Sequence, residues 1–118
     1  MSEFPVIRRA IPKRRYQVGD YGVTLLAEIE SGDGIDYTLI LAFVREGDAK
    51  PSLFVCAEQL PPGERGAGRY RLRVVNRAMS EVLDSGDGWA DPDRFTDEAL
   101  QVGMQLLGLG EETPYRLG

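Results

Sequence analysis

Residues 35–45 read IDYTLILAFVR, and this stretch decides the class of fold. Successive side chains of a strand point to opposite sides, so Leu39 and Phe43 share one side. Ile40 and Ala42 share the other side, and they are equally apolar. A strand that is apolar on both sides is typical of the middle of a sheet with material packed on each face. We therefore expect residues 35–45 to be the central strand.

Further strand patterns and turn residues surround this central strand. The other predicted strands cover residues 4–18, 21–30, 52–59 and 69–76. The first of these contains Pro5 and Pro12, and because proline cannot donate to a sheet ladder we expect an edge strand or an extended arm. Residues 78–84 fit either a further strand or a helical turn, since short apolar runs do not separate the two by period.

One amphipathic helix follows the strands. Asp91 suits the N-cap and Pro92 suits the first helical position, while Gly108 suits the C-terminal cap. Apolar residues repeat between them at helical spacing and form the predicted buried stripe, namely Phe95, Ala99, Val102 and Leu106. Because a row of strands precedes a single helix, we predict an α+β fold: an antiparallel β-meander of about four to five strands with the C-terminal helix packed on one face.

The length of 118 residues fits one domain, residues 1–118. Within it we expect a basic extended arm or edge strand over residues 1–15, the meander over residues 16–84 and the helix over residues 91–108. No apolar stretch approaches the roughly 18 residues that span a bilayer, and the first residues carry no apolar signal region. We therefore expect a cytoplasmic protein that does not act at a membrane.

The chain contains no histidine, and its single cysteine, Cys56, lies in an apolar run. Histidine is the commonest general base and metal ligand, so Ser-His-Asp and Cys-His catalysis and the usual zinc sites are excluded. A reactive thiol needs exposure and nearby positive charge, so we expect Cys56 to be an inert core residue. We expect no catalytic residues, no cofactor and no metal site.

The net charge of −5 hides a basic beginning. Five cations lie within the first fifteen residues: Arg8, Arg9, Lys13, Arg14 and Arg15. Together with Arg65 and the arginines at 69, 71 and 73, they could bind the phosphates of a nucleic acid. The arginines at 69, 71 and 73 alternate with apolar residues, so we expect them to face solvent. The simpler interpretation is solvated charge on an edge strand, which also blocks aggregation. The acidic remainder of the chain opposes nucleic-acid binding.

Acidic residues gather between Glu81 and Glu98, with Arg94 as the single base. Carboxylates on a loop could hold calcium or magnesium, or supply an acid–base pair for glycoside hydrolysis. Their spacing does not fit the calcium loop of an EF-hand, and nothing identifies a catalytic pair. Turn, capping and helix-dipole roles are therefore the favoured interpretation.

A glycine-rich loop covers residues 63–69. Glycine-rich backbone can cradle phosphate, but the loop lacks the Gly-Lys-Ser/Thr of a P-loop and a strand follows it where a nucleotide fingerprint needs a helix. We expect a hairpin loop.

Trp89 is the only tryptophan and comes just before the helix. An exposed tryptophan there would be a candidate contact for a protein partner. The favoured alternative is that Trp89 staples the helix start to the core, because large aromatic side chains are mostly buried.

The hypothesis for function is a small non-enzymatic protein-interaction or accessory domain that self-associates. Its support is a second apolar sheet face that one helix cannot cover, formed by Leu26, Ile40, Ala42, Val44, Phe54 and Val75. Either the N-terminal segment with residues 78–84 covers this face, or another subunit does. Nucleic-acid binding through residues 8–15 and a carboxylate-based small enzyme are the alternatives.

Overall fold

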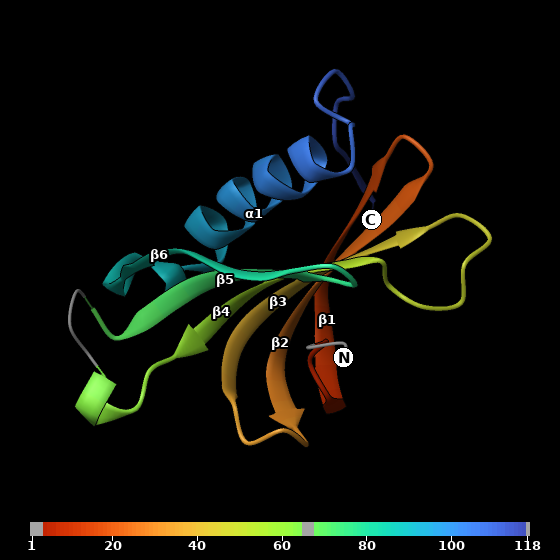
Figure 1. The fold of residues 1–118 in the computed structure, drawn as a ribbon. Coiled ribbons are helices and arrows are strands. Elements are labelled where there is room, and N and C mark those ends of the chain that lie inside the picture. Colours follow the sequence, from red (N-terminus) through yellow and green to blue (C-terminus); the bar gives the residue numbers. More distant parts are fainter. Residues whose placement is uncertain (1–3, 65–67, 118) are drawn as a thin grey trace.

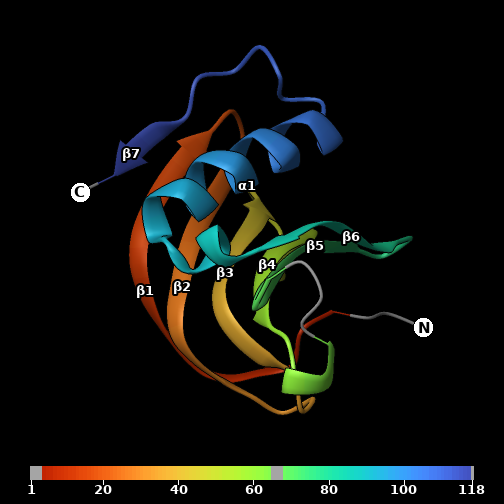
Figure 2. The same cartoon turned by 90° about the vertical axis from the view of Figure 1, so that its left-hand side faces the viewer.

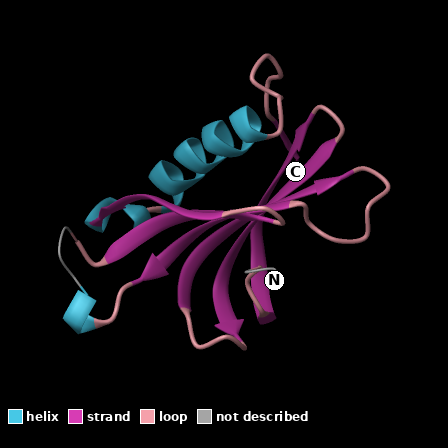
Figure 3. Ribbon diagram, viewed as in Figure 1, coloured by secondary structure: helices cyan, strands magenta, loops and turns pink. Residues whose placement is uncertain are grey.

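A computed structural model describes residues 4–64 and 68–117 of the chain. Its centre is a seven-stranded antiparallel sheet in the order β6-β5-β4-β3-β2-β1-β7 (Figure 1). The strands are β1 (Ile7–Val18), β2 (Tyr21–Ser31), β3 (Asp36–Arg45), β4 (Leu53–Gln59), β5 (Tyr70–Asn76), β6 (Ser80–Gly86) and β7 (Tyr115–Leu117). Two short 3-10 helices, η1 (Pro62–Glu64) and η2 (Asp87–Ala90), and one α-helix, α1 (Pro92–Leu106), complete the fold (Figure 3).

The predicted α+β class and antiparallel sheet are confirmed, but the predicted number of about four to five strands was too low. Residues 78–84 fall largely in β6, because the Asn76 side chain accepts hydrogen bonds from the amides of Ala78 and Met79 and turns the chain back. The chain then returns after α1 as β7, which lies beside β1 (Figure 2) and whose three residues pair with Arg15–Gln17. Such a short strand has no alternation long enough to detect in sequence. β3 is the fourth of the seven strands, as its two apolar sides predicted.

α1 packs on one side of the sheet, here called the helix face. The Asp91 side chain accepts a hydrogen bond from the Asp93 amide at 2.9 Å, which caps the helix as expected. Phe95 and Ala99 are fully buried against the sheet. A Cβ on Gly103 would lie 2.2 Å from Cζ of Phe43, so the absence of a side chain lets α1 approach the central strand.

The opposite side of the sheet, here called the second face, carries its own apolar cluster. The buried members are Tyr37, Ile40, Ala42, Phe54 and Cys56. The N-terminal segment, residues 4–7, covers part of them: Phe4 meets Phe54 edge to face with ring centroids 5.4 Å apart, and Ile7 packs on the same cluster. In Figure 1 the segment that leads into β1 and α1 lie on opposite sides of the sheet. The apolar side chains on β3 to β5 of this face are thus buried within one chain, except that of Val44, which is half-buried.

Candidate functional site

The second face contains a buried group of charges beside its apolar cluster. Glu58 of β4 is 1% exposed and accepts hydrogen bonds from two arginines of β5. The Arg71 Nε lies 2.7 Å from one carboxylate oxygen, and the Arg73 Nε donates to the other. Arg73 also donates through Nη1 to the Ser80 hydroxyl of β6 at 2.7 Å. Three neighbouring strands are therefore joined by charged and polar side chains.

These arginines correct the expectation that the alternating arginines of β5 face solvent. Arg73 is only 7% exposed, and its Nη2 has no hydrogen-bond partner among the described residues. Burial disfavours the charged guanidinium, but the charge of Glu58 and its hydrogen bond outweigh burial and raise the pKa of Arg73. Arg65, another member of the predicted phosphate-binding set, lies outside the described residues.

Cys56 lies on the same face and is fully buried. Burial, and then the negative charge of Glu58, raises the pKa of the thiol far above its usual range. The thiol is therefore protonated at neutral pH, and a protonated, buried thiol is a poor nucleophile. Glu58 and Arg73 are buried, while Arg71 is partly exposed.

Asp33, in the turn between β2 and β3, ties the N-terminal segment to the sheet. One carboxylate oxygen accepts from the Tyr37 hydroxyl at 2.7 Å and from the Val6 amide at 3.1 Å. The other accepts from the Ile35 amide at 3.1 Å. Burial opposes ionisation of Asp33, but the hydrogen bonds together outweigh it and lower the pKa of the carboxyl.

The five predicted phosphate-binding cations lie on β1, and two of them form ion pairs. Lys13 pairs with Glu28 of β2 at 3.3 Å. Arg14 pairs with Asp93 of α1 at 2.5 Å, and this hydrogen bond is the main reason that the pKa of Arg14 is raised. The remaining three, Arg8, Arg9 and Arg15, are exposed. Nucleic-acid binding through residues 8–15 stays a prediction.

Trp89 is 5% exposed and belongs to the core on the helix face. Its Nε1 donates to Asp84 at 3.1 Å, and the Arg94 guanidinium carbon lies 4.9 Å from the centre of the ring. Burial favours the staple interpretation and leaves little of the indole for a partner.

The acidic segment shows the local roles that were favoured for it. Asp84 accepts from Trp89, and Asp87 accepts from the Arg69 amide at 2.9 Å. Asp91 caps α1, and Asp93 pairs with a β1 arginine. Among residues 4–64 and 68–117, no group of three or more acidic or sulfur side chains is placed to hold a metal ion. A carboxylate-based activity stays a prediction.

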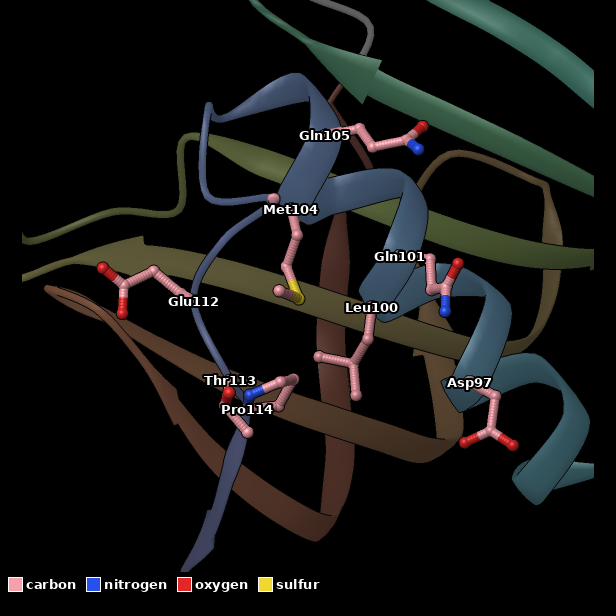
Figure 4. A pocket seen from close by; sticks show the side chains of 9 residues that line it. Asp97, Leu100, Gln101, Met104, Gln105, Glu112, Thr113 and Pro114 are labelled. Carbon is pink, nitrogen blue, oxygen red and sulfur yellow. The ribbon is translucent and has the colours of Figure 1, made fainter.

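A groove that was not predicted lies between α1 and the C-terminal tail, residues 107–114. Its volume is about 550 Å³. Side chains from both walls line it: Asp97, Leu100, Gln101, Met104, Gln105, Glu112, Thr113 and Pro114 (Figure 4). We call it the α1–tail groove. The signal that could have found it is the pair of apolar residues Leu100 and Met104, which lie one helical turn apart and extend beyond the predicted buried stripe.

Two exposed apolar side chains, Tyr115 and Leu117, project from β7 at one edge of the sheet. Tyr115 is 71% exposed and Leu117 is 44% exposed. Leu117 is paired with Arg15, and Arg15 with Thr24, which in turn faces Ala42 of the second-face cluster. Directly paired residues of antiparallel strands share a face, so these side chains form an outer strip of the second face. We define the outer strip as Tyr115, Leu117 and Arg15.

No helix among the described residues is long and apolar enough to cross a membrane. Compared with protein families, curated proteins and solved structures, the chain matches none of them.

Proposed function

We propose that the chain is a small non-enzymatic protein-interaction domain that associates with a second copy of itself through the outer strip. The observation that carries this proposal is the exposure of Tyr115 beside Leu117 on a three-residue strand. Tyrosine offers a large apolar ring and a polar tip at little cost in conformational entropy, and it is enriched at protein interfaces. Arg15 lies beside them, and arginine is the cation most often found among strong interface contacts.

Part of the second face is already buried within one chain, so an interface would form only on the part that stays exposed. Ile40 is fully buried and Phe54 is 6% exposed within a single chain, so they do not require a partner. Exposed side chains remain on β7, β1 and β2, and also on β6, where Val82 is paired with the buried Arg73 and is 48% exposed. A partner that covers the outer strip would extend the coverage that the N-terminal segment begins.

Analytical ultracentrifugation between about 10 µM and 1 mM tests this proposal. We expect the wild-type chain to shift to a dimer as the concentration rises, and the variant Tyr115→Ser with Leu117→Ser to remain a monomer. Leu106→Ser is the matched control, because Leu106 is 46% exposed but lies on α1. A wild-type chain that stays monomeric throughout, or a control that also loses the dimer, would overturn the proposal.

A further inference from the structure

The α1–tail groove has an apolar floor and an acidic, exposed rim. Leu100 and Met104 form the floor, and each is 8% exposed. In Figure 4 their side chains point from α1 toward Pro114 on the tail, while Asp97 and Glu112 lie toward opposite ends. A buried floor with an exposed rim describes a groove that opens to solvent along its length.

The tail that forms the second wall is held in place. The Leu109 amide donates to the Met104 carbonyl at 2.7 Å, and the Glu112 amide donates to the Leu109 carbonyl at 3.0 Å. A Cβ on Gly19 would lie 3.4 Å from Cδ2 of Leu109 and 3.6 Å from Cδ of Glu112, so the tail lies against the turn between β1 and β2. The groove is therefore formed before any partner arrives, which lowers the entropic cost of binding.

The two segments that form the groove carry side-chain charge of one sign, while Arg14 and Arg116 lie outside these segments on the same face of the sheet. Residues 97–114 contain four carboxylates and no lysine or arginine, and the last turn of α1 contains no basic residue. The negative end of the helix dipole is thus not compensated by a side chain of that turn. Two of the carboxylates, Asp97 and Glu112, line the groove, and the other two, Glu98 and Glu111, do not.

We propose that the α1–tail groove docks an extended segment of another protein that carries a lysine or arginine on each side of one apolar residue. The apolar side chain packs on Leu100 and Met104, where the unbranched methionine adapts to its shape. The flanking cations meet Asp97 and Glu112 at the rim, and the amides of Gln101 and Gln105 are available to the backbone of the segment. This surface is separate from the outer strip, so the proposal does not depend on self-association.

The probe is a labelled peptide, Lys-Ala-Leu-Ala-Lys, added to the full-length ¹⁵N-labelled chain at low ionic strength. We expect amide shifts that cluster within residues 97–114 and a dissociation constant between about 0.1 and 1 mM, as befits a short peptide. Two control peptides separate charge from shape: Glu-Ala-Leu-Ala-Glu removes the cations, and Lys-Ala-Ser-Ala-Lys removes the apolar residue. We expect each to bind at least about fivefold more weakly.

The variant Asp97→Asn with Glu112→Gln removes both rim charges and preserves side-chain size. Glu98→Gln with Glu111→Gln is its matched control, with the same change in net charge on the same two segments. We expect the first variant to weaken binding by about five- to tenfold, which two exposed ion pairs can supply, and the second by less than about twofold. Equal losses in both variants, equal binding of the serine peptide, shifts outside residues 97–114, or no binding at 1 mM would each overturn the proposal.

Discussion

The two faces of the sheet are closed by different means. On the helix face, an apolar stripe of α1 packs on apolar strand residues, and Phe95 and Phe43 are fully buried. On the second face, the N-terminal segment covers part of the apolar cluster, and an ion cluster centred on Glu58 lies beside it. A helix covers a face with repeating, non-directional contacts, whereas the N-terminal segment and the ion pairs depend on a few specific partners. Matched substitutions on the two faces should therefore lower the free energy of unfolding by different amounts.

The largest effect is expected for aromatic truncation at the centre of the helix face. Phe43→Ala leaves a cavity beneath Gly103 between two rigid elements, and we expect it to lower the free energy of unfolding by about 4 to 5 kcal/mol. Phe54→Ala on the second face should cost about 2 to 3 kcal/mol, because the N-terminal segment can move into the space. Urea unfolding followed by circular dichroism measures both. Equal losses would show that the segment is as rigid as the helix.

A change at Glu58 should separate charge from burial on the second face. Glu58→Gln leaves Arg73 buried without a counter-charge, and we expect a loss of about 3 kcal/mol. Glu58→Met combined with Arg73→Met removes both buried charges, so it should cost less than the single change. Glu28→Gln breaks the exposed pair with Lys13 and serves as the control, with a loss under about 1 kcal/mol. If the double variant is less stable than Glu58→Gln, the cluster contributes more to the free energy of unfolding than the neutralisation of the two buried charges.

Most of the helix face could be predicted from sequence, although the predicted buried stripe wrongly included Leu106, which is 46% exposed, and omitted Leu100 and Met104. The second face could be predicted only in part. Period-two alternation located β3, and the cap at Asp91 located the start of α1, because both signals are local. The arginines of β5 were assigned to solvent because their counter-charge, Glu58, comes 13 and 15 residues earlier and meets them only through the β4–β5 register. A glutamate inside an otherwise apolar strand was the available clue.

The exposed features were the least predictable. The α1–tail groove requires the tail to fold back against α1, which depends on capping contacts at Leu109 and on the turn at Gly19. The outer strip requires β7 to pair with β1, about 100 residues away in the chain. Trp89 shows the opposite case, since general burial statistics for large aromatic residues favoured the packing that is found.

The smallest effect on the free energy of unfolding is expected from pH, and it concerns the N-terminal segment on the second face. The folded pKa of Asp33 lies below its ordinary value of 3.8, so the carboxylate stabilises the fold fully above that value. This contribution is lost as pH falls through the lower, folded pKa, when protonation removes an acceptor for Tyr37 and Val6.

The free energy of unfolding, measured between pH 5 and pH 2, should therefore fall less steeply in Asp33→Asn than in the wild type. Asp48→Asn is an acidic control in the exposed turn after β3 and should leave the slope closer to that of the wild type. If the free energy of unfolding of Asp33→Asn falls with pH as steeply as that of the wild type, the Asp33 contacts do not hold the N-terminal segment on the sheet.

The direction of β7 has a practical consequence for fusion proteins. β7 is antiparallel to β1 and runs from the partner of Gln17 to the partner of Arg15, so the chain leaves it heading toward the start of β1. Among the described residues, no strand pairs with residues 7–14 on the side away from β2. Polypeptide attached after β7 is thus delivered along an open strand edge at high effective concentration, where an extended linker can add itself to the sheet. A C-terminal tag should begin with proline, which cannot donate to the ladder, and glycine, which weakens a strand.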